Sequence, residues 1–448
     1  MIVKLPRKWK PYLLLSVSLL LAFLVITGIN SVTTPALSKN FNRNQKKSVQ
    51  RMVQEGQNIF RYDTFGSEDF WGQQLRLHQA IKGAKLGGIG PGVSPRTALS
   101  LGLKVDCETL PRSLVNPLKK GKVNLDDPAT TVELLKLDAV LGLTGFFDSQ
   151  GQLDSLGIQC ALCHSTVDDS LAPGIGRRLD GWANRDLNIG AIIAIAPNLE
   201  PFANLLEVDQ NTVRRVLRGW GPGKFDAQLV LDGKGFRPDG KTAATLIPPA
   251  FGLAGINLHT WTGFGSVPYW NAFVAVLEMH GKGNFLDERL NNPAQFPVAA
   301  RAGLWNVRNE PDLVSAKLPA LHFYQLSLHA PEPPAGSYNQ EAALRGKALF
   351  EGKARCNTCH IPPTYSEPGF NMHRPEEIGV DSFQADRSPQ RRYRTAPLKG
   401  LWTHQKGGFY HDGRFATLLD VVNHYNQVLN LNLAAQEKQD LVEFLKSL

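Results

Sequence analysis

Cys160-Ala161-Leu162-Cys163-His164 and Cys356-Asn357-Thr358-Cys359-His360 are two copies of one pentapeptide pattern, Cys-x-x-Cys-His. On a helical turn, positions i, i+3 and i+4 share a face, so the two thiols and the imidazole of each copy point to one side. This arrangement suits c-type haem, in which the cysteines add to the vinyl groups and the histidine coordinates iron. A structural zinc half-site and a thioredoxin-like redox motif leave the repeated histidine unexplained. The sequence therefore predicts two c-type haems as cofactors.

The two motifs use four of the five cysteines, and only Cys107 remains. A lone cysteine usually packs as a small hydrophobic side chain. No disulfide framework is available without removing a cysteine from a haem motif.

The first 38 residues have the pattern of an export segment. An apolar run of about 18 residues, 12–29, is long for a secretory signal and just sufficient to span a bilayer. Ala36-Leu37-Ser38 offers a cleavage site, so a cleaved signal peptide and an uncleaved membrane anchor both remain open. The run is preceded by the basic residues Lys4, Arg7, Lys8 and Lys10. Because a basic flank stays inside, either interpretation predicts a periplasmic or other extracytoplasmic location.

Positive charge is concentrated at the N-terminus. Of the formal net charge of +9, residues 1–60 contribute +8, from nine Lys and Arg and the single acid Glu55. The other 388 residues hold 40 basic and 39 acidic side chains, which leaves +1. A nearly neutral body does not indicate a nucleic-acid-binding surface.

The segments with clear periodicity are helical, which predicts a mainly α fold with two cytochrome c-type haem domains. The second domain is expected over 337–448, because a helix over 342–350 precedes the motif and apolar residues at helical spacing close the chain over 434–448. A proline-rich linker at 330–336 marks its boundary. The first domain is expected over 45–330 with large loop-rich insertions, since about 95 residues separate its first helix from Cys160.

Two stretches of the second domain resemble a known family. They are Tyr393-Arg394-Thr395-Ala396-Pro397-Leu398-Lys399-Gly400 and the stretch from Gly408-Phe409-Tyr410-His411-Asp412-Gly413-Arg414 to Asn426. Both are similar to the second haem domain of bacterial di-haem cytochrome c peroxidases and of their relative that matures the tryptophan-derived cofactor of methylamine dehydrogenase. The resemblance covers about residues 318–448 and is thin over 45–317.

The resemblance implies a distal ligand for the second haem. Tyr425 falls where the peroxidases place a methionine and the maturation enzyme a tyrosine. His424 points about 100° away on a helix, so both cannot be ligands. For the first haem the sequence offers Met279, with His280 as an alternative and core packing as the plain interpretation. Further, weaker candidates are Met372, His373 and His411.

The chain departs from the family after the first haem. The counterpart of the family's Trp-Asp-Gly-Arg segment is sought at Met279-His280-Gly281-Lys282, which lacks the tryptophan. Glu288 is the acid/base candidate that this register offers. The tryptophans that remain as candidates to bridge the haems are Trp261, Trp270, Trp305 and Trp402. The resemblance also leaves calcium open, since the family often holds one between its haem domains, although no carboxylate cluster in the sequence argues for it.

The sequence thus favours an exported di-haem oxidoreductase of the peroxidase kind. It would take electrons from a small donor protein, a cytochrome or a cupredoxin, and pass them between the haems to peroxide or oxygen. Two alternatives stay open: a membrane-tethered electron-transfer cytochrome without enzyme activity, and a di-haem oxygenase whose insertions shape a pocket for an organic substrate.

Overall fold

The computed structural model describes the backbone from residue 35 and the side chains from residue 45 to residue 448. The expected apolar run at 12–29 lies outside the described residues. Among the helices that are described, none is long and apolar enough to cross a membrane. The chain divides into two compact units, Met1–Met52 and Val53–Leu448. Helix α2 (Pro35–Tyr62) begins in the first unit and ends in the second, and both haem motifs belong to the second unit.

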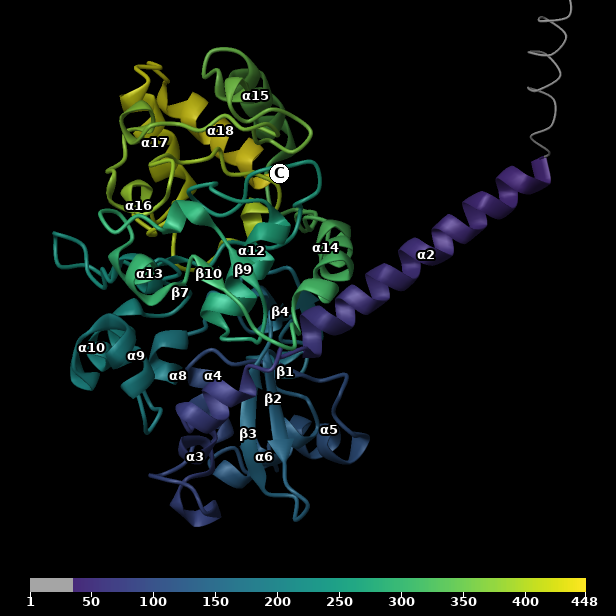
Figure 1. The fold of residues 1–448 in the computed structure, drawn as a ribbon. Coiled ribbons are helices and arrows are strands. Elements are labelled where there is room, and N and C mark those ends of the chain that lie inside the picture. The colour runs from purple at the N-terminus through teal and green to yellow at the C-terminus, as the bar shows by residue number, and fades with distance from the viewer. Residues whose placement is uncertain (1–34) are drawn as a thin grey trace, which may run out of the picture. The chain divides into compact units, whose positions relative to one another are not determined.

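The C-terminal part is built on two helices that cross closely, α15 (Gln340–Glu351) and α18 (Ala435–Lys446). The Asn339 side chain caps α15 by accepting a hydrogen bond from the Ala342 N–H at 2.9 Å. At the crossing, a Cβ on Gly346 would lie 2.0 Å from the Asp440 carbonyl oxygen. Only glycine allows the two backbones to approach this closely. Figure 1 shows both helices with α17 (Leu418–Val428) in the same part of the molecule.

Shorter elements complete this C-terminal part. They are η7 (Cys356–Thr358), η8 (Pro375–Ile378), α16 (Phe383–Asp386) and η9 (Leu401–Thr403). A hydrophobic core runs from Phe350 to Leu448. The predicted helices over 342–350 and 434–448 are therefore confirmed with boundaries shifted by a few residues.

Residues 62–330 fold around a larger hydrophobic core of their own, which runs from Ile59 to Tyr324. Its helical elements are η2 (Asp69–Gln74), α3 (Leu77–Lys82), η3 (Ala84–Leu86), α4 (Pro95–Ser100), α5 (Arg112–Lys119), α6 (Pro128–Lys136), α7 (Ala161–His164), α8 (Ile189–Ile193), α9 (Glu200–Leu206), α10 (Gln210–Trp220), α11 (Leu229–Asp232), α12 (Val267–Phe273), η4 (Val274–Glu278), η5 (Glu288–Leu290), α13 (Pro297–Ala302), η6 (Ser315–Lys317) and α14 (Leu318–Ser327).

Strands are short and pair two by two in the described part of the chain. The sheets are β1 (Val105–Asp106) with β5 (Ile175–Gly176), β2 (Leu143–Phe147) with β3 (Leu153–Ile158), β4 (Ser165–Val167) with β6 (Arg178–Asp180), β7 (Lys224–Phe225) with β8 (Thr245–Leu246), and β9 (Phe285–Leu286) with β10 (Asn306–Val307). Only β1 and β5 run parallel. The predominantly helical character agrees with the prediction.

The insertion ahead of the first haem motif ends in a hairpin. Strands β2 and β3 are antiparallel, and Asp148 closes their turn by accepting hydrogen bonds from the N–H groups of Gln150 and Gln152. Figure 1 shows the hairpin beside α3 and α6. Strand β3 ends at Ile158 and therefore delivers the chain directly to Cys160.

A buried ion-pair cluster joins the two cores. Arg387 follows α16 and has no exposed side-chain surface. Its guanidinium contacts Asp232 at 2.8 Å and Asp226 at 3.0 Å, and both carboxylates belong to the part around the first core. Next to it, the Gln384 side chain donates to Gln228 at 2.9 Å. The division into haem domains at 45–330 and 337–448 stays a prediction, because contacts of this kind tie Val53–Leu448 into one unit.

Candidate haem-binding sites

The second Cys-x-x-Cys-His motif holds its histidine in an orientation that suits iron. Arg355 adopts a left-handed conformation, the tight turn η7 follows, and the His360 N–H bonds the Cys356 carbonyl at 2.9 Å. The His360 Nδ1 lies 2.9 Å from the Tyr365 carbonyl oxygen. A carbonyl only accepts, so Nδ1 carries the proton and Nε2 keeps its lone pair for a metal.

The first motif is held by the segment that follows it. The Cys163 carbonyl accepts from the Asn184 N–H at 2.9 Å, and the His164 carbonyl accepts from the Gly181 N–H at 2.8 Å. Burial lowers the pKa of His164 to about 4, against a smaller opposing effect of the Pro248 carbonyl. The imidazole is therefore neutral near pH 7, as a metal ligand must be. Both motifs fit covalently attached haem by their donor chemistry.

Tyr425 faces the second motif from α17. Burial raises the pKa of Tyr425, and the nearby Cys359 and Cys356 sulfurs add to this effect, which places the phenol against the motif. The Tyr410 ring lies 6.3 Å away, centroid to centroid. The His424 Nε2 instead lies 2.8 Å from the Ile378 carbonyl oxygen. Of the two neighbours, Tyr425 is thus the one available as a distal ligand.

The chain repeats the turn and helix that carry Tyr425. Phe409 pairs with Phe415 across the turn before α17, and His259 pairs with Gly265 in the same way before α12. The conformations match, and their left-handed residues are Thr260 and Gly263 in one turn and Tyr410 and Gly413 in the other. Each helix then starts at a hydroxyl cap, Ser266 or Thr417. The two haem motifs are therefore followed by equivalent structural units.

Equivalent positions of the two helices carry different chemistry. Counted from the turn, the residue equivalent to Tyr425 is Ala275, because α12 begins one residue nearer to its turn than α17 does. Counted from the helix start, Tyr425 is the eighth residue of α17 and Val274 is the eighth from the start of α12. Neither an alanine nor a valine side chain can bind iron. Glu278 lies four residues beyond Val274, where a helix brings a side chain back to the same face. This part of the helix is π-helical, Val274–Glu278, a geometry that is frequent at functional sites.

Glu278 is a half-buried residue with a buried carboxyl oxygen that the sequence did not single out. Burial, and next the charge of Asp226, raise its pKa well above the ordinary value. Its Oε1 is buried and has no hydrogen-bond partner among the described residues. The end of η4 and the first motif share a neighbour, the Asp63–Phe65 turn. The Phe65 carbonyl accepts from the Lys282 N–H at 2.8 Å, and the Asp63 charge acts on the Cys160 thiol.

Met279, His280 and Glu288 lie close to Glu278 in the sequence but in different surroundings. Met279 is 3% exposed, and its carbonyl accepts from the Trp71 indole at 2.8 Å. The His280 ring stacks on Phe70 with centroids 3.5 Å apart, and burial lowers its pKa to about 3. Glu288 is exposed on the 3₁₀ turn η5. Among the described residues, none of the three has a hydrogen bond or ion pair to the first motif, and Met279 shares the hydrophobic core with Leu162.

Among the candidate bridging tryptophans, Trp261 stands where the two parts meet. Its indole N–H donates to the Leu246 carbonyl at 2.8 Å, and its carbonyl accepts from the Arg394 N–H at 3.2 Å. Leu246 in turn bonds the His411 carbonyl at 2.7 Å. Trp261 also occupies, in the repeated turn, the position of His411. This turn precedes Met279–Lys282, where the sequence places the counterpart of the family's Trp-Asp-Gly-Arg segment.

The other tryptophans have different surroundings. Trp270 packs in an aromatic cluster, with the Phe264 ring 4.5 Å away. Trp305 is half-buried beside β10. Trp402 meets Trp182 edge to face at 5.3 Å and donates to the Pro331 carbonyl at 2.9 Å.

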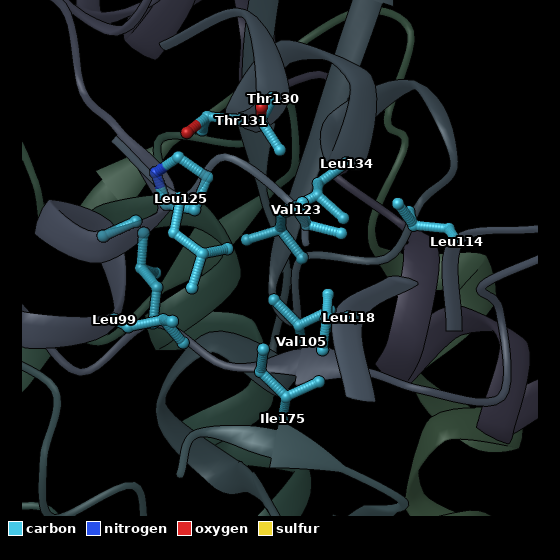
Figure 2. Close-up of a pocket in the computed structure, with 14 residues that line it drawn as sticks. Leu99, Val105, Leu114, Leu118, Val123, Leu125, Thr130, Thr131, Leu134 and Ile175 are labelled. Atoms are coloured by element: carbon cyan, nitrogen blue, oxygen red, sulfur yellow. The ribbon is translucent and has the colours of Figure 1, made fainter. Parts of the chain in front are cut away.

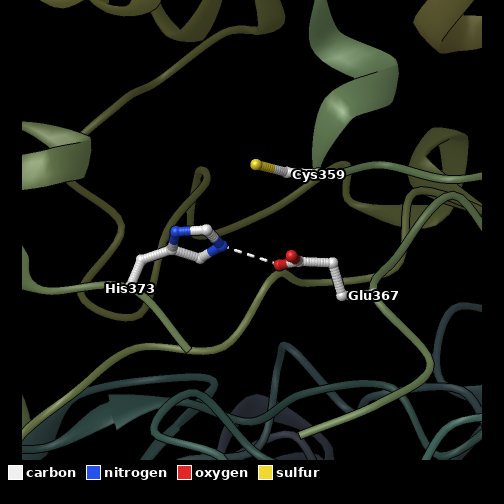
Figure 3. Close-up of side chains that lie close together, drawn as sticks. All are labelled: Cys359, Glu367 and His373. Atoms are coloured by element: carbon white, nitrogen blue, oxygen red, sulfur yellow. Dashed lines mark hydrogen bonds and ion pairs between the residues drawn. The ribbon is translucent and has the colours of Figure 1, made fainter. Parts of the chain in front are cut away.

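Beside the second motif, Cys359, Glu367 and His373 come together (Figure 3). The His373 Nε2 lies 2.7 Å from Glu367, and the Cys359 sulfur and then Glu367 raise the pKa of His373 to about 9. Once Cys359 is a haem thioether it can no longer supply a charge, so only the carboxylate effect persists. Across the described part of the chain this is the one cluster of metal-ligating side chains, and it offers a single carboxylate. That donor set does not suit calcium.

The insertion encloses a small apolar cavity of about 20 Å³ between α4, α5 and α6 (Figure 2). Leu99, Leu118, Leu134 and Ile175 are among its lining residues. A cavity of this size holds about one water molecule, whereas pockets for organic ligands measure about 300–1,000 Å³. It does not provide the substrate pocket that an oxygenase would need.

Comparisons with known proteins agree with the sequence resemblance. No family model matches the chain. The methylamine utilization protein MauG of Methylorubrum extorquens is 28% identical over 152 residues, 29% of this chain and 42% of MauG. The cytochrome-c peroxidase IdrP1 of Denitromonas iodatirespirans is 30% identical over 24% of this chain and 40% of its own length. IdrP2 of Pseudomonas sp. is 24% identical over 38% of this chain and 57% of IdrP2.

The matched regions thus span between about two fifths and three fifths of these relatives. A solved structure of Kuenenia stuttgartiensis hydrazine synthase aligns over 48% of this chain and 75% of that chain with 21% identity, and its TM-score of 0.28 carries no argument. The resemblance read from the sequence is confirmed, and the curated relatives of this chain belong to the superfamily of di-haem cytochrome c peroxidases and MauG.

Proposed function

We propose that this chain is an exported di-haem c-type cytochrome that reduces peroxide with electrons from a small donor protein, a cytochrome or a cupredoxin. The observation that carries the proposal is the asymmetry of the repeated helix. In α17 the helix carries Tyr425, which faces the second motif. In the helix that follows the first motif, the corresponding residue is Val274, and Glu278 comes one turn later. The names of the relatives, two cytochrome-c peroxidases and MauG, support the same reaction class.

In this proposal the haems supply one-electron chemistry and an iron site for peroxide. His164 and His360 are the proximal ligands, and each is neutral because burial lowers its pKa. Tyr425 would offer the second haem iron a further ligand. Val274, at the corresponding position of the other helix, would offer the first haem none.

Glu278 is the proposed proton donor at the first site. Its pKa is raised by burial and by Asp226, so it holds a proton at pH values where an ordinary glutamate does not. Cleavage of peroxide to water consumes protons, and a positioned carboxylic acid can supply one. Glu288, the acid that the sequence offered, is exposed and remains a secondary candidate.

Trp261 is the proposed contact between the two haem sites. It bonds Leu246, two residues before Pro248, whose carbonyl acts on His164. On its other side it bonds Arg394, two residues before Ala396, whose backbone acts on His360. Hydrogen bonds thus join Trp261 to two backbone segments, each of which runs within two residues to a group that influences a motif histidine.

The proposed location is the periplasm or another extracytoplasmic space, on the basic and apolar N-terminal pattern and on covalent haem attachment. Whether residues 12–29 are removed or form an inner-membrane anchor stays a prediction. Calcium is not part of the proposal.

The test combines haem quantification, electron paramagnetic resonance and turnover. We expect two haems per chain, a high-spin ferric signal in the oxidised or half-reduced protein, and peroxide-dependent oxidation of a reduced small cytochrome. Two low-spin signals in both states, without turnover, would contradict the proposal and favour the alternative of an electron-transfer cytochrome.

A further inference from the structure

Two arginines, one buried and one half-buried, have buried guanidinium nitrogens without a hydrogen-bond partner among the described residues. Arg185 is 8% exposed, and its Nε, Nη1 and Nη2 have no hydrogen-bond partner among the described side chains and backbone. Arg394 donates from Nε to the Thr260 carbonyl, but its buried Nη1 has no partner within the same residues. Burial lowers the pKa of both to about 10. Arg387, which is buried more deeply than either, pairs with two carboxylates.

A buried guanidinium without a counter-charge is strongly unfavourable, because it loses its hydration and gains no partner in return. The surroundings of Arg185 make an unpaired state less favourable still, because Lys224 and His404 are its charged and titratable neighbours. The nearest acid in the sequence, Asp186, is already shared by Lys104 and Lys406. The site therefore calls for an anion that the described residues do not supply.

Each arginine lies beside one haem motif. Asn184, next to Arg185, bonds the Cys163 carbonyl at 2.9 Å. Arg394 stands two residues before Ala396, whose backbone acts on the pKa of His360. The Arg185 side chain extends from the first motif toward Gly407, with Nη1 only 3.4 Å from where a Cβ on that glycine would lie. The backbone of Arg185 thus adjoins the first motif, and Arg394 adjoins Thr395, which lies 3.1 Å from His373 in the cluster that contains Cys359 of the second motif.

We propose that Arg185 and Arg394 each bind a propionate of the haem attached at the neighbouring motif, Arg185 at the His164 haem and Arg394 at the His360 haem. A c-type haem carries two propionate carboxylates, and the planar fork of arginine matches a carboxylate with two parallel hydrogen bonds. The inference rests on the proposed function only in requiring two bound haems.

The test is to measure the midpoint potential of each haem, with resonance Raman of the propionate bending mode, in the full-length chain. Removing a positive charge beside a haem favours the ferric state. Arg185→Gln is expected to lower the potential of the His164 haem by about 59 mV, a tenfold change in its one-electron equilibrium constant, and to shift the bending mode. Arg394→Gln is expected to do the same at the His360 haem. Arg185→Lys keeps the charge and should restore most of the potential.

Arg218→Gln, at an exposed position of α10, is the control and should change neither reading. The inference is overturned if two haems are present and the Gln variants leave both midpoint potentials unchanged. An unchanged propionate bending mode in these variants overturns it as well. It is also overturned if the wild-type potentials respond to added acetate, because the arginines would then bind an anion from solution. Fewer than two haems per wild-type chain would instead contradict the proposed function.

Discussion

The guanidinium of Arg387 lies 3.0 Å from the carboxylate of Asp226, and neither side chain is more than 1% exposed. Burial raises the pKa of Asp226 to about 6 although the Arg387 charge opposes this. The same carboxylate raises the pKa of Glu278. The Arg387–Asp226 ion pair therefore links the two cores, and its carboxylate also raises the pKa of the proposed proton donor, Glu278.

We expect Arg387→Met to destabilise the protein by about 3–5 kcal/mol, because it leaves Asp226 and Asp232 buried without a counter-charge. The measurement is the free energy of unfolding from denaturant titration of the haem-loaded protein. Arg96→Met is the control, since that arginine and its partner Asp126 are both 65% exposed, and its loss should cost at most about 1 kcal/mol. Equal losses of unfolding free energy in the two variants would show that the buried cluster stabilises the protein no more than a surface ion pair does.

Tyr425→Met is expected to raise the midpoint potential of the second haem, because a methionine ligand stabilises ferrous iron relative to an oxygen ligand. Redox titration with optical detection measures it. Tyr338→Phe, on the half-buried tyrosine just before α15, is the control and should leave the potential unchanged. An unchanged potential in the Tyr425 variant would show that the phenol is only a core side chain.

The sequence predicts well what depends on local pattern. The helix before Cys356 and the closing helix follow from apolar spacing, and both haem motifs follow from residue type and spacing. The hairpin Leu143–Ile158 before Cys160 was not predicted, because its strands are short and glycine interrupts them.

The repeated turn was also missed, for a physical reason. Thr260-Trp261-Thr262-Gly263 and Tyr410-His411-Asp412-Gly413 share only the glycine. The common shape comes from left-handed backbone at the first and last positions, which several residue types can adopt at a cost. Glu278 and Arg185 stand out only when distant segments, such as Asp226 and Gly407, come beside them.

Trp261→Phe is expected to slow electron transfer between the haems, since it removes the hydrogen bond to Leu246 and the larger ring between the two parts. The rate is measured by flash photolysis of the carbon monoxide complex of the half-reduced protein. Trp305→Phe, on the half-buried tryptophan beside β10, serves as control. Equal rates in all three proteins would move the route elsewhere, with the Trp182–Trp402 contact as the next candidate.

Glu278→Gln is expected to lower the rate of peroxide reduction by about 10²–10⁴-fold, the usual contribution of a positioned acid. The amide keeps the shape of the side chain but cannot release a proton, so haem content and the unfolding free energy should change little. Glu288→Gln, at the exposed position, is the control and should retain activity. A reversed result, with loss only in the Glu288 variant, would restore the candidate read from the sequence.

Glu278 also determines in which direction the rate of peroxide reduction changes with pH. A proton donor works while it is protonated, so wild-type activity should persist above the ordinary glutamate range and fall as the pH rises through the raised pKa of Glu278. Asp226 is the second cause of that raised pKa, after burial. Asp226→Asn removes its negative charge and should therefore move the alkaline fall to lower pH. Steady-state rates over a pH series measure both profiles, and an unmoved profile in the Asp226 variant would show that the essential proton belongs to another group.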